Sequence, residues 1–361
     1  QTSSSALKIP VSIQKTPASV QVITHAVIQD RGALSINQAI ETVSGVERNL
    51  TFPNSLTFRV RGFVDASTTL RDGFREQTGT QDIQGVDNIE VLKGPASVLY
   101  GGSTSSGGTV NVTTKRAIAN HNFLNAGLSG GSFGLFRGTA DGNRDLSGDG
   151  KIVGRINFAY QHDDTFRDFG YNETTYVAPT VQWTPSLHDN IDFFASWQLS
   201  NYTWSASQTP LIRKALALPL SYNFDNRTLG ASHQNSWRLG YNWVHKFSDS
   251  FRFRSGFASS INNYNFGTDR MSTFALSTNG RTLSRGVSSG PQMGKDFDLQ
   301  NELSGIFHTG PLKHDWLVGS ELYQTDYSAK TYAASLPPLV LTDPVYTGLP
   351  GPARLRSNIS T

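Results

Sequence analysis

The sequence predicts an α+β domain at residues 10–118, followed by an antiparallel transmembrane β-barrel at residues 119–361. Three observations support this fold class. Apolar and polar residues alternate with a period of two along most of the chain after residue 120, as in strands with one apolar face. The connectors between these segments are alternately short and long. Before residue 120, the sequence combines predicted strands with one segment of helical spacing and with glycine-rich loops.

The N-terminal part is predicted element by element. Residues 1–9 form a polar, serine-rich tail. A helix is expected over residues 36–43, where apolar side chains recur at helical spacing, with Ser35 as its N-cap and Gly45 as its stop. Residues 88–116 contain two strands that are separated by a Gly-Pro turn, a short helical turn and a Gly/Ser-rich loop.

After residue 120 we expect about nine strands from the period-two pattern. In one of them, Trp237 and Leu239 share an apolar face, and Ser236 and Arg238 share the opposite polar face. The expected strands lie near residues 121–131, 133–142, 151–163, 172–184, 190–204, 232–246, 250–265, 294–308 and 314–328.

The connectors favour a membrane barrel over a large soluble β-sandwich, which also alternates. The connectors near 185–189, 248–249 and 309–313 are short, whereas those at 205–231, 266–293 and from 329 onward are long. Outer-membrane barrels have this asymmetry, with the short turns on the periplasmic side. The segments also exceed the usual length of soluble strands, about 5–6 residues, and aromatic residues crowd their ends.

Composition excludes several classes of protein. A mean hydropathy of −0.34 suits a soluble protein but also a barrel, whose two faces average out. A net charge of +3 is too balanced for a nucleic-acid-binding surface. With 0 cysteines, neither disulfides nor thiolate metal sites are available. No apolar run of about 18 residues exists for a membrane-spanning helix. No signal peptide is visible at Gln1, so we expect a mature, trimmed or partial chain.

Two enzyme or metal motifs are present but lack their context. Residues 127–131 fit the spacing of a nucleophile elbow around Ser129, which would need a strand followed by a helix. A hydrolase remains a rival that predicts activity lost on Ser129→Ala. Residues 145–150 begin like a calcium loop, but Ile156 stands where a bidentate Glu is required. The segment is better interpreted as a periplasmic turn.

The sequence resembles the TonB-dependent outer-membrane receptors, most closely their ferric-siderophore subfamily. Residues 8–118 resemble the family's plug domain in the segments 9–13, 19–24, 58–63, 72–75 and 91–116. Residues 131–134 resemble its first barrel hairpin, and residues 163–168 resemble the end of its third strand. The resemblance implies a barrel of about 22 strands. About nine such strands cannot close around a plug, so we expect the C-terminal part of the barrel to be missing. The family's TonB box is not recognisable in residues 1–9.

The resemblance implies import of a ferric siderophore into the periplasm, powered by TonB with ExbB and ExbD. It implies a monomeric, multi-pass barrel in the outer-membrane lipid of a Gram-negative-type bacterium, with no catalytic residues and no nucleic-acid partner. No cofactor or protein-bound metal is expected, because the iron arrives inside its chelator. An importer of cobalamin, haem or an oligosaccharide is the alternative, followed by a passive porin or an adhesin.

The resemblance also suggests ligand contacts at the outward apex of the plug and on the barrel wall. Arginines suit anionic chelates, Gln and Thr offer neutral donors, and aromatic rings pack against a catecholate or hydroxamate. The alternative is that Arg59, Arg61 and Arg75 pair with carboxylates inside the plug. The expected ligand-binding residues are Arg61, Phe63, Arg75, Gln77, Thr78, Thr80, Tyr202 and Trp204.

A second set of charged residues is expected to hold the plug to the barrel until energy input shifts it. The alternative is that the barrel carboxylates of this set are simply hydrated in the lumen and do not hold the plug. The expected ionic contacts are Arg59, Glu90, Lys93, Arg116, Glu302 and Glu321. The structural turn of the plug is expected at Gly94, Pro95, Tyr100 and Gly101.

Overall fold

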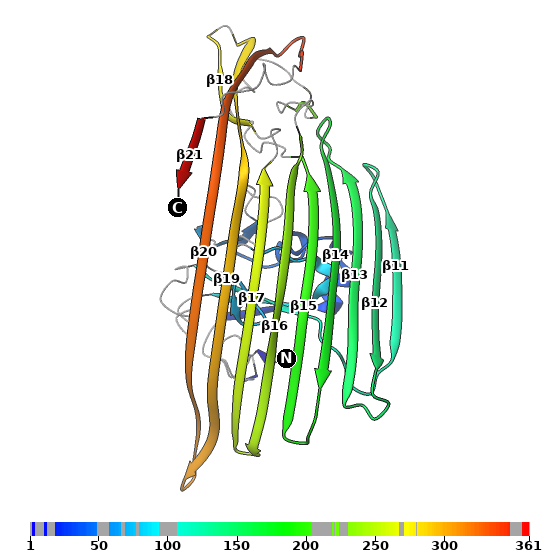
Figure 1. Cartoon of the computed structure of the whole chain (residues 1–361), viewed down its shortest axis with the longest axis vertical. Helices are drawn as coiled ribbons and strands as arrows, with labels where there is room; N and C mark the ends of the chain where they lie inside the picture. The colour runs from blue at the N-terminus through cyan, green and yellow to red at the C-terminus, as the bar shows by residue number, and fades with distance from the viewer. Residues whose placement is uncertain are drawn as a thin grey trace.

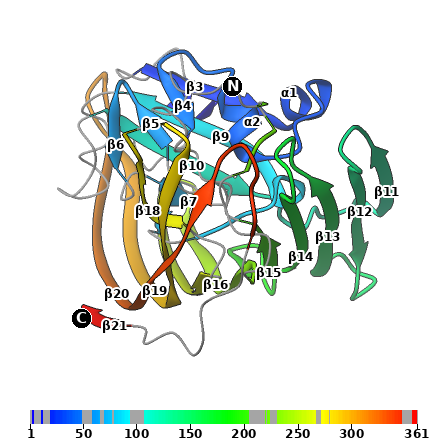
Figure 2. The ribbon, with the colours of Figure 1, turned by 90° about the horizontal axis from the view of Figure 1, so that it is seen from above.

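The computed structural model consists of a small N-terminal domain and one large curved sheet (Figure 1). Figure 2 shows the sheet as an arc, with the N-terminal domain on its concave side. The structure describes residues 2–3, 11–12, 19–48, 58–65, 69–76, 79–93, 107–203, 219, 221–223, 230–266, 271–278, 280–346 and 356–360. Among these residues, no helix has the length and apolarity to cross a membrane.

The N-terminal domain is built on a five-stranded sheet in the order β3-β9-β10-β7-β8, in which only the β10–β7 pair is parallel. Its strands are β3 (Ser19–Thr24), β9 (Val86–Lys93), β10 (Gly108–Thr114), β7 (Thr69–Arg71) and β8 (Phe74–Arg75). A three-stranded sheet joins β4 (Val46–Arg48), β5 (Phe58–Val60) and β6 (Phe63–Asp65), and β1 (Thr2–Ser3) pairs with β2 (Val11–Ser12).

The helices of this domain are short and capped. The predicted N-cap is confirmed, because Ser35 Oγ accepts a hydrogen bond from Gln38 N at the start of α2 (Ile36–Ile40). The helix ends earlier than predicted, and the chain turns at Gly45, whose φ is +72°. The pattern did not predict α1 (His25–Asp30), which follows β3 directly with Thr24 as its cap. A turn of 3₁₀ helix, η3 (Ile83–Gly85), precedes β9.

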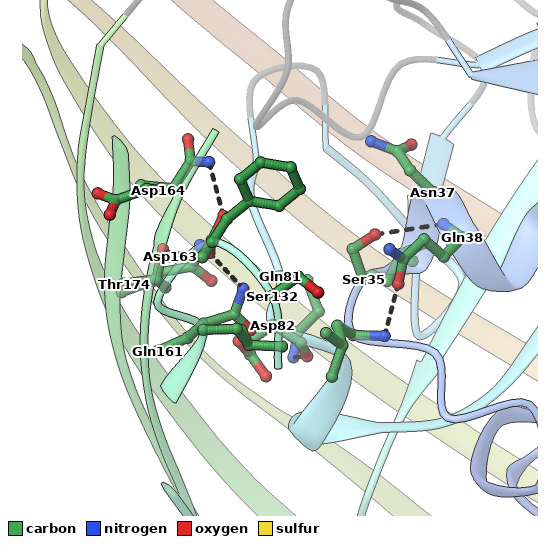
Figure 3. A pocket seen from close by; sticks show the side chains of 16 residues that line it. Ser35, Asn37, Gln38, Gln81, Asp82, Ser132, Gln161, Asp163, Asp164 and Thr174 are labelled. Atoms are coloured by element: carbon green, nitrogen blue, oxygen red, sulfur yellow. Dashed lines mark hydrogen bonds between the residues drawn. The ribbon is translucent and has the colours of Figure 1, made fainter. Parts of the chain in front are cut away.

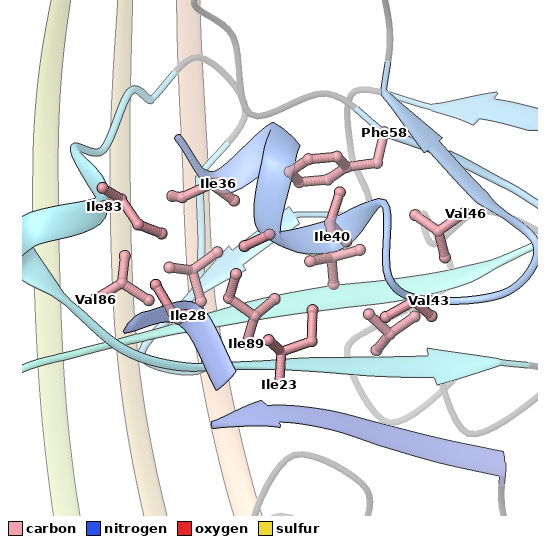
Figure 4. Close-up of a cluster of buried hydrophobic side chains, with 14 of the residues drawn as sticks. Ile23, Ile28, Ile36, Ile40, Val43, Val46, Phe58, Ile83, Val86 and Ile89 are labelled. Atoms are coloured by element: carbon pink, nitrogen blue, oxygen red, sulfur yellow. The ribbon is translucent and has the colours of Figure 1, made fainter. Parts of the chain in front are cut away.

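One apolar core holds the helices against the five-stranded sheet (Figure 4). Ile36 and Ile40 of α2 pack with Ile28 of α1 and with Ile89 of β9. Burying each such side chain contributes about 1.5–3 kcal/mol. This domain therefore has a core of its own, and Phe74 adds a smaller apolar contact with Phe194 and Ala258 of the large sheet.

The large sheet is antiparallel throughout and its strands follow one another in chain order. Its main path runs in order from β11 to β17 and continues with β19, β20 and β21. Strand β18 lies off this path and pairs with β19. The strands of the sheet are β11 (Phe123–Gly130), β12 (Phe136–Asp145), β13 (Ile152–Asp164), β14 (Tyr171–Trp183), β15 (Asp189–Tyr202), β16 (Ser232–Ser248), β17 (Phe251–Phe266), β18 (Met271–Leu276), β19 (Thr282–Thr309), β20 (Leu312–Val340) and β21 (Arg356–Ser360).

The outer face of this sheet is apolar and uncovered. In β16, Trp237 and Leu239 are 54% and 57% exposed, whereas Ser236 and Arg238 are buried toward the N-terminal domain. Leu124, Phe193 and Leu322 are likewise exposed. A β-sandwich would bury such rows between two sheets. The predicted fold class is confirmed, and the sandwich alternative is wrong.

The strands differ from the prediction mainly at β19 and β20, which have 28 and 29 residues. Residues 282–293 and 329–340, expected in long loops, belong to these strands. Small residues such as Gly286, Ser288 and Ser289 hide the alternation there, and pairing between the two strands extends both. Residues 145–150 do form a turn, in which Asp145 accepts hydrogen bonds from main-chain N–H groups. Ser129 lies in β11, which leads into β12 and not into a helix.

Candidate functional site

A buried cluster of charges joins the N-terminal domain to the large sheet at the turn between β7 and β8. Its centre is Asp72, whose Oδ2 lies 2.9 Å from Arg116 Nη2 and 3.0 Å from Arg238 Nη1 of β16. Arg238 also donates to the carbonyl oxygen of Arg71 at 3.0 Å. The Asp72 cluster comprises Arg71, Asp72, Glu76, Arg116, Asp192, Phe194 and Arg238.

Local turn chemistry presents Asp72 to these partners. Asp72 and Gly73 have φ values of +56° and +81°, the conformation that tight Asp-Gly hairpin turns require. Thr114 N and its hydroxyl donate to Asp72 Oδ1 at 2.8 and 2.9 Å. Burial opposes ionisation, but Arg116, Arg238 and Thr114 outweigh it and lower the pKa of Asp72 to about 2. The carboxylate is therefore charged throughout the physiological pH range.

Three other members of the cluster, Arg71, Glu76 and Phe194, are also buried. Arg71 pairs with Glu76 and donates to Gln81 Oε1 at 2.9 Å. Burial raises the pKa of Glu76 against the attraction of Arg71 and Arg238. The ring of Phe194 from β15 lies 4.1 Å from the Arg116 guanidinium carbon and 4.5 Å from that of Arg238. The contact of Arg116 with this ring gives the sheet a further contact with the N-terminal domain, whereas Arg238 belongs to the sheet itself.

Two more groups of contacts join the domain to β12–β14. Arg137 Nη2 of β12 lies 2.6 Å from Asp82 Oδ1, and Lys115 Nζ lies 3.0 Å from Asp141 Oδ2. Burial lowers the pKa of Lys115, while Asp141 opposes that shift. Gln81 donates to the hydroxyl of Tyr176 in β14 at 2.7 Å. These contacts are buried, so each charged group depends on its partner.

Arg75 makes the corresponding contact with the other side of the sheet. Its Nε lies 2.8 Å from Glu321 Oε1 in β20, and its main-chain N donates to Asp298 Oδ2 at 2.8 Å. Its guanidinium also lies over the ring of Tyr323, 5.2 Å from the centroid. Arg75, expected among the ligand-binding residues, therefore holds the domain to the sheet. Glu321, expected among the ionic contacts between the domains, has Arg75 as its partner, a residue outside the set expected there.

The other residues expected to form ionic contacts between the domains have different partners. Arg59 pairs with Glu47 inside the N-terminal domain, which is the alternative considered for it. Lys93 donates to Gln21 Oε1 and Ser44 O in the same domain. Glu302 pairs with Arg254 of the neighbouring strand.

For Arg59 and Lys93 the prediction is corrected, because polar partners within their own domain lie closer than the large sheet. The contact of Glu302 with the N-terminal domain stays a prediction. Glu90 is buried within β9 of the N-terminal domain. Arg116 has its ion pair with Asp72 in its own domain, although its guanidinium also contacts Phe194.

The remaining residues expected to bind a ligand do not gather at one place. Arg61 lies in the exposed turn after β5, and Phe63 begins β6. Thr80 is buried with its hydroxyl 3.1 Å from Ser236 Oγ, and Tyr202 packs on Tyr264. Their role in ligand binding stays a prediction. The residues that lie outside the described residues are Gln77, Thr78, Trp204, Gly94, Pro95, Tyr100 and Gly101.

A cavity of about 360 Å³ opens between the N-terminal domain, the turn that leads into β12, and the strands β13–β15. In Figure 3, Ser35, Asn37 and Gln38 line it from the side of α2, and Gln161, Asp163, Asp164 and Thr174 line it from the sheet. Most of its lining side chains are polar, which suits a hydrogen-bonding ligand. Among the described residues, no three His, Asp or Glu side chains are placed to hold a metal ion.

The sequence did not predict most residues of the Asp72 cluster or of the cavity. The period-two pattern marked Arg238 as inward-facing but did not identify Asp72 as its partner. Arg137, Asp141 and Asp82 carried the same signal, an ionisable group on the polar side of a strand or next to a turn. The cavity has no motif in the sequence, because its walls come from elements far apart in the chain.

Both the N-terminal domain and the large sheet are similar to known proteins. The family described as TonB-dependent Receptor Plug Domain matches residues 12–109. The metal-pseudopaline receptor CntO of Pseudomonas aeruginosa PAO1 is 28% identical over 337 residues, which are 92% of this chain and 47% of that protein. The ferrioxamine B receptor of Salmonella typhimurium SL1344 is 26% identical over 373 residues, 96% of this chain and 51% of that protein.

Solved structures agree with the fold. The siderophore receptor PiuA from Acinetobacter baumannii superposes with a TM-score of 0.84 at 19% identity, covering 98% of this chain and 54% of that one. The ferripyoverdine receptor of Pseudomonas aeruginosa superposes with a TM-score of 0.79 at 20% identity, covering 92% and 45%. The chain spans about half the length of the relatives that it matches. The N-terminal domain is therefore a plug domain of the TonB-dependent receptors, and the large sheet has the fold of part of such a receptor's barrel.

Proposed function

We propose that the receptor carrying this chain imports a ferric siderophore across the outer membrane, with energy delivered by TonB. The observation that carries the proposal is the plug on the concave side of the barrel sheet. Buried ion pairs from Asp72 and Asp82 and a half-buried pair from Arg75 hold it there. A pore for free diffusion needs no such plug. A transporter that opens only when energised needs a closed state that is stable but reversible.

The relatives support the same class of substrate. Proteins named as receptors for metal-pseudopaline and for ferrioxamine B match more than nine-tenths of this chain. One further relative, from Escherichia coli K12, is named a ferrichrome outer membrane transporter and phage receptor and is 25% identical over 381 residues. We infer from these names that the ligand is a metal chelate and that the barrel lies in the outer-membrane lipid.

The geometry suggests how the plug works. Asp72 pairs with Arg116 of the plug and with Arg238 of the barrel, so in the closed state each of these charges has an oppositely charged partner. Displacing the plug separates Asp72 from Arg238 and leaves both ions to be rehydrated in the lumen. Ligand binding outside and pulling by TonB, with ExbB and ExbD, on the periplasmic side would supply this energy. The receptor acts as a monomer in this scheme.

No bond chemistry is required of the protein. The iron would enter inside its chelator, so no side chain need ligate it and no cofactor is needed. The transported species is recognised through the outer surface of the chelate, by hydrogen bonds, charges and aromatic contacts.

Uptake of radioactive iron tests the proposal. Cells that lack their other iron receptors are given ⁵⁵Fe bound to hydroxamate or catecholate chelators, with the receptor expressed or absent. We expect receptor-dependent uptake of one chelate class, abolished by deletion of TonB or by dissipation of the proton gradient. TonB-dependent uptake of cobalamin, haem or an oligosaccharide, with none of ferric chelates, would assign the alternative substrates. High conductance of the intact receptor in a planar bilayer would support a passive porin instead.

A further inference from the structure

The outer face of the large sheet carries a groove of about 740 Å³ across β11–β14, close to the turn at residues 145–150. Leu124, Leu146 and Ile156 line it, and all three side chains are more than half exposed. Gly142 and Gly154 also line it. A Cβ atom at Gly142 would lie 3.3 Å from Leu124 Cδ1, and one at Gly154 would lie 2.8 Å from Leu146 Cδ1. Side chains in place of these glycines would therefore occupy the groove.

The alternation of β12 assigns the groove to the side of the sheet that faces away from the plug. Asp141 and Asn143 are buried and point toward the plug, where Lys115 pairs with Asp141. Gly142 and Arg144 point the opposite way, because successive residues of a strand point to opposite faces. The groove is therefore continuous with the uncovered apolar face of the sheet.

Arg144 brings an unpaired positive charge to this groove. It lines the groove at the end of β12 and is exposed. Within the described residues it has no carboxylate partner, because both carboxylates of the adjacent turn are used. Asp145 accepts hydrogen bonds from main-chain N–H groups, and Asp149 Oδ2 lies 3.0 Å from Lys151 Nζ. A charge beside lipid-facing apolar surface is costly unless it finds a partner at the interface.

A tryptophan places Arg144 near the depth of lipid headgroups. In the sheet register, Gly154 lies opposite both Arg144 of β12 and Val181 of β14. Trp183 follows two residues after Val181 on the same outward face and is exposed. Tryptophan side chains gather where the hydrocarbon of a membrane meets its headgroups. The arginine therefore lies within reach of the phosphates of a lipid leaflet.

We propose that this groove binds a phospholipid of the periplasmic leaflet, with one acyl chain in the groove and the phosphate on Arg144. A guanidinium donates two parallel hydrogen bonds to phosphate oxygens. An apolar groove with an unpaired cation at its end matches a molecule that is apolar along its length and anionic at one end. Short turns such as residues 145–150 lie on the periplasmic side of outer-membrane barrels. The inference rests on the proposed function only in placing the sheet in the outer membrane.

Native mass spectrometry tests the proposal on the receptor carrying this sequence, delipidated in a neutral detergent. The two probes are dioleoyl phosphatidylglycerol and dioleoylglycerol, which has the same acyl chains but no phosphate. The first phosphatidylglycerol should bind at least about fivefold more tightly than the first dioleoylglycerol, the factor expected from one arginine beside an anionic headgroup. Equal affinity for the two probes, or binding of neither, would overturn the inference.

One pair of variants tests the charge. Arg144→Gln changes an exposed side chain and should lower the affinity for phosphatidylglycerol to that for dioleoylglycerol. Lys313→Gln removes an exposed cation at the start of β20, beside another short turn, and should keep the preference of the wild type. An Arg144→Gln variant that keeps the full preference overturns the inference.

A second pair of variants tests the groove itself. Gly142→Phe fills it and should weaken the binding of both probes at least about tenfold, because the ring displaces methylene groups of the acyl chain. Leu239→Phe enlarges an exposed side chain elsewhere on the same face and should bind as the wild type does. Unchanged binding by Gly142→Phe overturns the inference. A receptor dimer that forms without lipid and dissociates in Gly142→Phe would assign the groove to a second copy and overturn it as well.

The outcomes separate this inference from the proposed function. If ferric-chelate uptake depends on the receptor while both probes bind alike, the inference alone fails. If phosphatidylglycerol is preferred through Arg144 while no ferric chelate is taken up, the proposed function fails and the inference stands.

Discussion

Arg238→Gln is expected to loosen the plug from the barrel wall by removing one cation of the Asp72 cluster. In the wild type the cluster balances three cations against three carboxylates. The cations are Arg71, Arg116 and Arg238, and the carboxylates are Asp72, Glu76 and Asp192. Without Arg238, one buried carboxylate charge is in excess, a defect that costs about 3–5 kcal/mol in proteins. We expect about 3 kcal/mol, because Asp72 keeps Arg116 and Glu76 keeps Arg71.

Urea titration with two separate reporters measures this loss. The chain has 0 cysteines, so a fluorophore on Asp30→Cys in α1 reports on the plug alone. All 6 tryptophans lie after residue 180 and report on the barrel. With a slope of about 1.5 kcal/mol per molar, the plug midpoint should fall by about 2 M urea.

The matched control for this titration is Arg59→Gln, which breaks an exposed ion pair within the plug. It should shift the plug midpoint by about 0.5 M or less, because exposed pairs contribute little. Equal shifts for Arg238→Gln and Arg59→Gln would refute the role given to the buried cluster. A shift of the tryptophan signal with an unchanged fluorophore signal would place the effect in the barrel and would also refute it.

Three further predictions concern the same seam. Gly85→Ala should destabilise the plug by about 2 kcal/mol in the urea titration, because the new Cβ would lie 2.0 Å from the Tyr176 hydroxyl; wild-type stability would contradict the close packing seen there. Tyr176→Phe should cost only about 1 kcal/mol, since it removes one hydrogen bond with Gln81 and keeps the ring; a loss as large as that of Gly85→Ala would count against this reading. Asp72→Asn should destabilise the plug equally at every pH above about 4, and the difference from wild type should shrink as the pH falls toward the folded-state pKa of about 2; a difference that already shrinks between pH 8 and 5 would contradict the lowered pKa.

The sign of that pH dependence follows from the lowered pKa. A carboxyl group with a lower pKa in the folded state stabilises the fold above its unfolded pKa, near 3.8. That contribution is lost as the pH falls through the folded pKa of about 2. At neutral pH the contribution of Asp72 is therefore complete and insensitive to small changes of pH.

The architecture was predictable because it depends on local patterns. The cap at Ser35 and the Asp-Gly turn at Asp72 are set by residues within a few positions of each other. The alternation in β16 fixes which side chains face outward, because successive residues of a strand point to opposite faces. Strand lengths were less predictable where small residues carry no pattern, as at Ser288 and Ser289 of β19.

The candidate site was much less predictable because its contacts join distant segments. Arg75 and Glu321 are 246 positions apart in the chain, and only the folded register brings them to 2.8 Å. Alternation can say that Arg137 and Arg238 face inward, but it cannot say which carboxylate each one meets. The cavity combines α2 with strands from several hairpins, so no contiguous motif encodes it.

Cysteine scanning along β16 tests most directly whether this sheet faces lipid outside and the plug inside. Spin labels at 235, 237 and 239 and at 234 and 236 are introduced one at a time into the receptor in bilayers, and their collisions with dissolved oxygen are measured by power saturation. The exposed side of β16 predicts high oxygen accessibility at 235, 237 and 239 and low accessibility at the buried positions 234 and 236. The reverse pattern, or no alternation between neighbouring positions, would contradict the account.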